Sequence, residues 1–179
     1  DSVLPNEDLD AIEVSTCTID AEAVTVAEKT IAELDARGEA ALLEYVSRYD
    51  ESPRGARVLF DRDDLRSAVD RIEPDVRRVI ERAAERIRAF AELQASRLST
   101  CRMRVEDAGV AIGHDIVPME SAGCYAPGGR FPLPSSVLMS VIPAVVAGVG
   151  SIRLASPRPT DATLAAGWFA GVDALLAAG

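Results

Sequence analysis

The stretch Glu120–Ser156, ESAGCYAPGGRFPLPSSVLMSVIPAVVAGVGSIRLAS, decides the fold. It begins with a short apolar run at 122–126 and breaks at Pro127-Gly128-Gly129. A longer apolar segment follows at 137–149, and a second short run occupies 151–155. Strand, glycine loop, helix and strand in that order predict a βαβ unit.

The loop inside this stretch has features of an anion site. Gly128 and Gly129 let the backbone approach a ligand, and the next helix presents unpaired N–H groups. Ser135 and Ser136 are expected to be its N-caps. Because the G-x-G-x-x-G pattern is absent, a loop that only connects strand to helix stays an open alternative.

Several unusual residues also occur here in a fixed order. They are GCYAPGGRFPLPSSVLM at 123–139, IPAVVAGV at 142–149 and SPRP at 156–159, with ARGEAAL at 36–42 and Tyr49-Asp50 upstream. These segments resemble histidinol dehydrogenases, whose cofactor loop carries a G-x-Y-x-P-G-G motif. The resemblance identifies the chain as the N-terminal portion of a member of that family.

The resemblance implies an NAD-dependent, zinc-requiring oxidation of L-histidinol to L-histidine, the last steps of histidine biosynthesis, in a cytoplasmic homodimer. Tyr125 takes the tyrosine position of the motif, so it is implied to contact NAD, with Gly128 and Gly129 beside it. The alternative is a ring that only packs the loop. The family's zinc ligands and bases lie in its second half, so the chain is assigned no catalytic or metal residue. It is therefore expected to be inactive alone.

The amino-acid composition indicates which classes of binding partner and which redox compartment suit the chain. The 179 residues hold 19 basic and 29 acidic side chains, a net charge of −10, which does not favour nucleic acid or an anionic membrane. Cys17, Cys101 and Cys124 lack metal-site spacing, and an odd, sparse count suits a reducing cytosol. No apolar run approaches the length of a membrane span.

The sequence offers few residues that could act in nucleophilic catalysis or bind a metal ion. His114 is the only histidine, so no second histidine could help it to form a zinc site or serve as a base. We expect His114 to be a satisfied or exposed side chain. Cys124, beside the glycine loop, is expected to act as a small hydrophobic residue.

The whole pattern predicts an α/β fold, a Rossmann-like parallel sheet with flanking helices preceded by an N-terminal helical region. We assign residues 1–100 to the helical region and 101–179 to the first part of an NAD-binding domain. Strands are expected at 122–126, 151–155 and 172–176, and a hairpin at 103–117. Asp161 is expected to cap the helix that follows it.

Two features leave alternatives open. An apolar stripe from Leu65 to Phe90, broken before Pro74, fits either helices with one solvated face or an arm that packs on a second subunit. The strand at 172–176 is expected to come last in the sheet, with an edge that something else must cover. The chain could also be a related alcohol dehydrogenase, or a truncated binding module.

Overall fold

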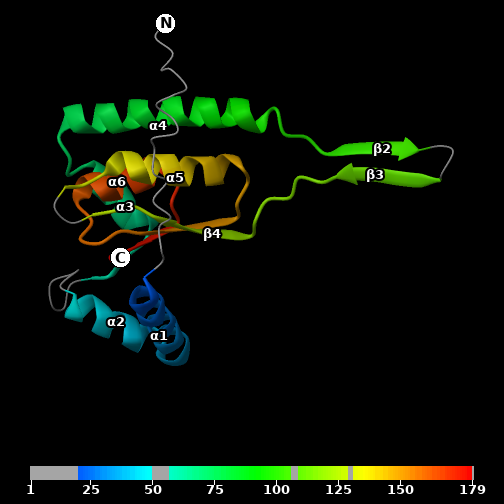
Figure 1. Cartoon of the computed structure of the whole chain (residues 1–179). Helices are drawn as coiled ribbons and strands as arrows, with labels where there is room; N and C mark the ends of the chain where they lie inside the picture. Colours follow the sequence, from blue (N-terminus) through cyan, green and yellow to red (C-terminus); the bar gives the residue numbers. More distant parts are fainter. Residues whose placement is uncertain (1–19, 50–56, 106–108, 129–130, 179) are drawn as a thin grey trace, which may run out of the picture. The chain divides into compact units, whose positions relative to one another are not determined.

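The computed structural model describes residues 20–49, 57–105, 109–128 and 131–178. Its elements, in chain order, are α1 (Ala21–Arg37), α2 (Glu39–Arg48), β1 (Leu59–Phe60), α3 (Arg62–Val69), α4 (Pro74–Ala95), β2 (Cys101–Val105), β3 (Val110–His114), β4 (Ser121–Tyr125), α5 (Pro134–Val146), β5 (Ser151–Ala155), α6 (Asp161–Ala170) and β6 (Ala174–Leu176). Figure 1 labels most of them. The α/β class predicted from the sequence is confirmed.

The chain divides into two compact units, Asp1–Leu42 and Leu43–Gly179. The sequence placed a boundary near residue 100, at the end of a helical region. In the structure α3 and α4 pack with α5 and α6, because the apolar sides of these helices share one core, and the boundary near residue 100 stays a prediction. Each unit is described by itself below.

In the first unit, α1 has a capping residue at each end. The Asp20 side chain accepts a hydrogen bond of 2.9 Å from the Glu22 backbone N–H. Gly38 has φ 56 and donates its N–H to the Leu34 carbonyl. Positive φ costs glycine little, so Gly38 ends the helix at this position.

In the second unit, four strands form one sheet in the order β1-β6-β5-β4. β4 pairs parallel with β5, and β5 pairs parallel with β6. The predicted parallel core and its βαβ unit are therefore confirmed. The expectation that the last strand forms the edge is wrong, because β1 pairs antiparallel with β6, with Leu59 opposite Leu176.

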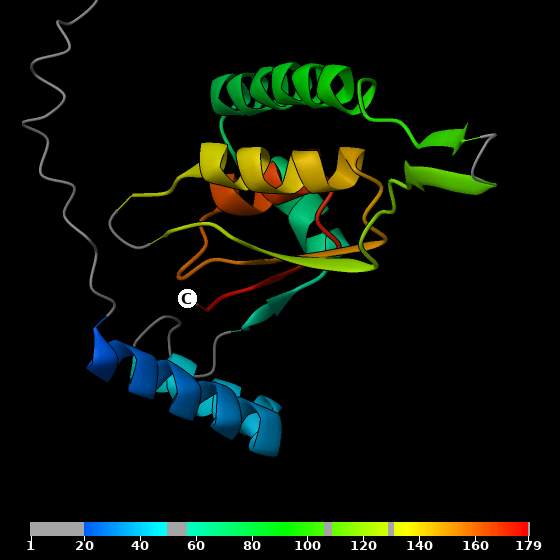
Figure 2. The ribbon, with the colours of Figure 1, turned by 45° about the vertical axis from the view of Figure 1, so that its right-hand side comes forward.

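Helices α3 to α6 lie on one face of this sheet (Figures 1 and 2). Alternate residues of the strands point into that layer, so Ile152, Leu154 and Leu175 are buried against the helices. The helices contribute Leu65, Leu138 and Ile142, also fully buried. Burial of each such side chain stabilises the fold by about 1.5–3 kcal/mol relative to exposure.

Polar contacts also attach α3 and the turn that follows it to α6 and the residues just after it. Arg71 bonds Asp161 at 2.7 Å, and the Arg62 guanidinium lies 4.5 Å from the centre of the Trp168 ring while donating to the Val172 carbonyl. The apolar stripe beginning at Leu65 is thus largely core. Phe90 at its end is exposed, which leaves the second-subunit alternative untested.

Two expected helix caps are wrong. α5 begins at Pro134, whose fixed φ suits the first helical position, so its N-cap is Leu133. Ser135 and Ser136 lie within the first turn. Thr160, not Asp161, caps α6, accepting from the Thr163 N–H.

The predicted hairpin is confirmed. β2 and β3 form a separate antiparallel pair, with Met103 opposite Ile112 at its middle. The hairpin extends from the end of α4 and leads into β4 (Figure 1). The turn residues 106–108 lie outside the described residues.

Candidate functional site

Tyr125 is the last residue of β4, at the carboxyl edge of the parallel sheet. The preceding residue, Cys124, faces the helices, since its Sγ lies 3.7 Å from the Ser140 carbonyl oxygen of α5. Side chains alternate along a strand, so Tyr125 faces the opposite side of the sheet. Its side chain is 54% exposed. Ligands of parallel α/β sheets commonly bind at this edge.

Gly128 shapes the loop after β4. A Cβ at this position would lie 2.1 Å from the Pro157 carbonyl oxygen, so only glycine permits the approach of the two backbones. The loop after β4 therefore rests on the loop after β5. The sequence-predicted partner Gly129 lies outside the described residues.

The first turn of α5 follows the same loop. Its N-cap residue makes no side-chain hydrogen bond, and proline at the first position supplies no N–H. The Ser136 N–H donates to the Leu133 carbonyl at 3.0 Å, and among the described residues no N-cap side chain accepts from this turn as Asp20 does in α1 or Asp61 in α3. A helix start of this type favours a negatively charged ligand.

Two arginines that the sequence analysis did not assign lie near this edge. Arg158, in the loop after β5, is exposed and has φ 47, an uncommon backbone conformation for a residue other than glycine. Arg153 is exposed within β5, directly opposite Gly123 of β4. The available signals were an arginine between two prolines and a single charge inside the short strand SIRLA.

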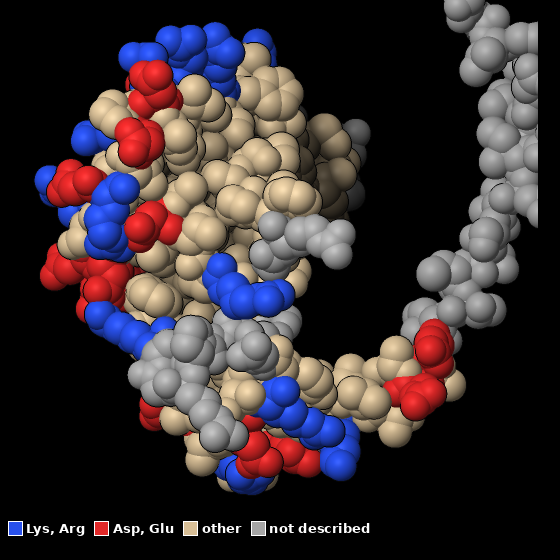
Figure 3. Space-filling view, turned by 90° about the vertical axis from the view of Figure 1, so that its left-hand side faces the viewer, with Lys and Arg blue, Asp and Glu red and all other residues tan. Residues whose placement is uncertain are grey.

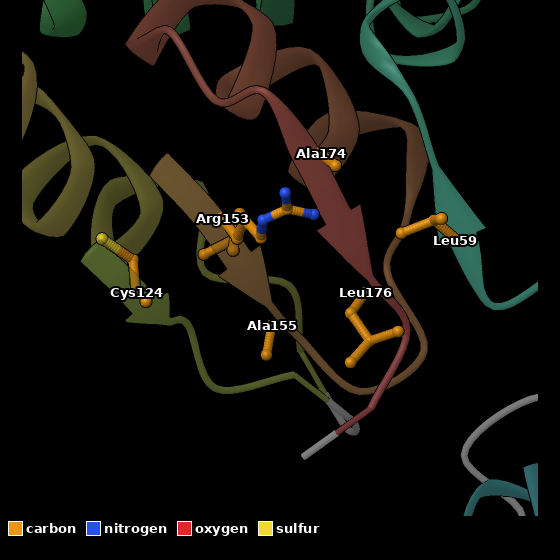
Figure 4. A pocket seen from close by; sticks show the side chains of 8 residues that line it. Leu59, Cys124, Arg153, Ala155, Ala174 and Leu176 are labelled. Atoms are coloured by element: carbon orange, nitrogen blue, oxygen red, sulfur yellow. The ribbon is translucent and has the colours of Figure 1, made fainter. Parts of the chain in front are cut away.

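The side of the sheet that α3–α6 leave open carries a shallow apolar cavity of about 250 Å³. Its lining includes Leu59, Ala155, Ala174 and Leu176, and the Arg153 guanidinium extends over it toward β6 (Figure 4). A Cβ on Gly123 would meet no atom within 4 Å. The cavity floor is thus apolar with one cation.

Of the other sequence candidates, Cys124 also lines the cavity, whereas His114 lies on the separate β2–β3 pair. Burial raises the pKa of the Cys124 thiol, which disfavours a nucleophilic thiolate. His114 lies exposed on β3, with Nε2 3.0 Å from the Ser99 carbonyl oxygen. Across the described ranges, no three His, Cys, Asp or Glu side chains come together as metal ligands would.

Figure 3 looks toward the carboxyl edge and shows how charge is distributed there. Basic and acidic side chains are interspersed along the left margin and across the lower part of the view, and much of the surface between them is uncharged. A broad field of one sign, typical of nucleic-acid binding, is not seen on this face. No helix in the described part of the chain is long and apolar enough to cross a membrane.

A family model described as histidinol dehydrogenase matches residues 15–179. The chain belongs to the histidinol dehydrogenase family. The resemblance seen in the sequence is thereby confirmed. This family of oxidoreductases acts in histidine biosynthesis.

Curated relatives and a solved structure agree with this assignment. The histidinol dehydrogenase of Burkholderia lata is 38% identical over 156 residues, covering 83% of this chain and 36% of the relative. That of Aquifex aeolicus is 38% identical over 159 residues, covering 85% and 36%. The crystal structure of histidinol dehydrogenase from Elizabethkingia anophelis matches 98% of this chain and 41% of its own, with a TM-score of 0.80.

At 23% identity, the solved structure shows a shared fold. The chain spans 36% of the length of the curated relatives named above.

Proposed function

We propose that this chain forms part of the NAD site of a histidinol dehydrogenase, which oxidises L-histidinol to L-histidine with zinc. The observation that carries the proposal is the position of Tyr125. Its exposed ring lies at the carboxyl end of a parallel strand, and the loop to an uncapped helix follows. An aromatic ring there can lie against a nucleotide while backbone N–H groups meet phosphate.

Each group at this edge would have a separate role in binding NAD. The Tyr125 ring would hold the flat part of the nucleotide, and Arg158 with the first turn of α5 would neutralise the pyrophosphate. Gly128 would keep the two loops together so that these groups stay in position. NAD, when bound, accepts the hydride removed from the alcohol.

The described residues do not fit a zinc site, because they bring no three potential ligands together. No step through zinc is therefore derived for them. The proposal assigns the metal and proton-transfer groups to residues beyond those described, and we expect no histidinol oxidation by these 179 residues alone.

The remaining parts of the proposal follow from the family. The substrate is a small amino alcohol, the compartment is the cytoplasm, and the functional protein is a homodimer. Residues 101–179 are proposed as the first part of the NAD-binding domain. Helices α3 and α4, from the preceding helical region 1–100, complete its helical layer.

The experiment is a titration of the folded chain with NADH, followed by the fluorescence of the cofactor. Tyr125→Ala should raise the dissociation constant about 3- to 10-fold, since an aromatic contact contributes about 0.5–1.5 kcal/mol. Tyr125→Phe keeps the ring and should change the constant by less than about twofold.

Met139 provides the matched control, as an equally exposed large side chain on α5. Met139→Ala should leave the affinity for NADH unchanged. An unchanged affinity of Tyr125→Ala, or a folded wild type that does not bind NADH, would contradict the proposal.

A further inference from the structure

Phe131 is an aromatic residue beside the glycine loop, and the proposed NAD site assigns it no role. Its side chain is 71% exposed, which makes it the most exposed aromatic side chain of the described residues. Leu133, two residues further on, and Tyr125, at the other end of the loop, are also exposed. Large apolar side chains gathered in water at one edge of a sheet are typical of a surface that binds a ligand.

Prolines restrict the backbone that carries this ring. Pro132 follows Phe131 directly, and a residue before proline is restricted to extended backbone. Pro134 is the first residue of α5, so only Pro132 and Leu133 separate Phe131 from the helix. A phenyl ring has two rotatable bonds, and its backbone is already restricted here. Ordering it against a ligand therefore costs little conformational entropy.

The two exposed aromatic residues stand at opposite ends of the same loop. Tyr125 is the last residue of β4, whereas Phe131 lies three residues before the start of α5. NAD also has two flat rings, adenine and nicotinamide, which are joined through the two riboses and the pyrophosphate. In the proposed site the pyrophosphate lies at the first turn of α5, between these aromatic residues. The site thus offers one aromatic side chain for each ring of the cofactor.

We infer that Phe131 stacks on the adenine ring of the cofactor. The nicotinamide must lie where water is excluded, because it exchanges the hydride with the substrate. Adenine takes no part in that step, so it suits the more exposed of the two aromatic residues. The phenyl ring has no hydrogen-bonding group, and an aromatic face stacks on a purine without needing one. The inference rests on the proposed NAD site and names the residue that holds one end of the cofactor.

Competition between NADH and ADP-ribose on the full chain tests this inference, because ADP-ribose keeps the adenine and the pyrophosphate but lacks the nicotinamide. Phe131→Ala should raise the dissociation constants of both compounds about 3- to 10-fold. Phe131→Tyr keeps the ring and should change them by less than about twofold. Phe90, which is 62% exposed on α4, provides the matched control, so Phe90→Ala should leave both constants unchanged.

A second test detects the stacking directly. The wild type has one tryptophan, Trp168, which is half-buried on α6. In Phe131→Trp the new indole should lie on the adenine, so ADP-ribose should quench the tryptophan emission of this variant. The emission of the wild type and of Phe90→Trp should not change.

The outcomes separate this inference from the proposed function. Weaker NADH binding by Tyr125→Ala but not by Phe131→Ala, with no quenching in Phe131→Trp, would overturn the inference and leave the proposed NAD site intact. Weaker binding of NADH but not of ADP-ribose by Phe131→Ala would assign the ring to the nicotinamide end and would also overturn it. A folded wild type that binds neither compound would overturn both proposals.

Discussion

Gly128 is the residue at which the two loops of the carboxyl edge come closest. Gly128→Ala would bring a Cβ to within 2.1 Å of the Pro157 carbonyl oxygen, and the backbone of one loop would have to move. We expect a loss of about 1–3 kcal/mol in the free energy of unfolding, as for other overpacked sites. Urea unfolding followed by circular dichroism measures this loss.

Gly123 provides the matched control within the same strand–loop segment. A Cβ at Gly123 meets nothing within 4 Å, so Gly123→Ala should change stability by less than about 0.5 kcal/mol. Equal stability of the two variants would contradict the close approach at Gly128.

At the level of single residues, one motif of the sequence led to Tyr125. Tyr125 stands where a ligand-binding residue of a parallel sheet belongs, although its contact with NAD stays a prediction. Arg153 and Arg158 were missed because their placement depends on which side of a strand is covered and on how two distant loops meet. Neither property is encoded within a few neighbouring residues.

Among the described helices, α3 has the most complete set of capping hydrogen bonds at its N-terminus. The Asp61 side chain accepts from the Asp63 and Asp64 N–H groups, and the Asp64 side chain accepts in turn from the Asp61 N–H at 2.8 Å. The hydrogen bond from the Asp64 N–H, together with the positive charge of Arg57, holds the pKa of Asp61 below its ordinary value of 3.8. Ionised Asp61 is therefore favoured in the folded state.

This pKa shift predicts how the contribution of Asp61 depends on pH. A pKa that is lower in the folded state contributes stability above the unfolded value of 3.8, and that stability is lost as the pH falls through the folded value. Asp61→Asn keeps the cap without the charge, so it should be less stable than the wild type at pH 7. The difference should shrink below pH 3.8, as measured by thermal unfolding.

Asp61→Ala serves as the comparison because it removes the cap at every pH. It should stay less stable than Asp61→Asn at both ends of the range, since asparagine is a good N-cap and alanine is a poor one. A wild-type advantage over Asp61→Asn that does not change with pH would contradict the role of the ionised carboxylate.

Elements with strong local patterns were predicted well from the sequence. Periodic apolar residues placed α3 and α4, alternation placed the hairpin, and short apolar runs placed the parallel strands. The start of α5 was misjudged because two serines were given more weight than the proline before them. The pairing partner of β1 could not be predicted. β1 forms only two ladder pairs, and its partner β6 lies more than a hundred residues further along the chain.

At the scale of the molecule, the second unit holds a core of its own. Every residue of its main buried cluster lies between Leu65 and Leu175, and the partly buried side chains packed on that cluster begin at Phe60. The sheet has helices α3–α6 on one face, and β1 covers the edge of β6. The expectation that the final strand needs cover from elsewhere failed because this cover comes from an earlier part of the same chain.

Two fragments of the chain test whether the second unit folds on its own core and how much β1 contributes to its stability. A fragment of residues 57–179 keeps β1 and the whole buried cluster, so it should unfold cooperatively with the urea midpoint of the full chain. A fragment of residues 61–179 keeps the Asp61 cap but lacks Leu59 and Phe60. It also loses the hydrogen bond of 2.7 Å from the Ala177 N–H to the Val58 carbonyl.

The shorter fragment should be less stable by about 2 kcal/mol, because the partly buried Phe60 is removed and a backbone hydrogen bond is lost. It should also aggregate more readily, since the bare edge of β6 can pair with another chain. Equal midpoints for the two fragments would mean that β1 contributes nothing to the sheet. A loss of stability already in 57–179 would mean that the second unit depends on residues before Arg57, contrary to a self-contained core.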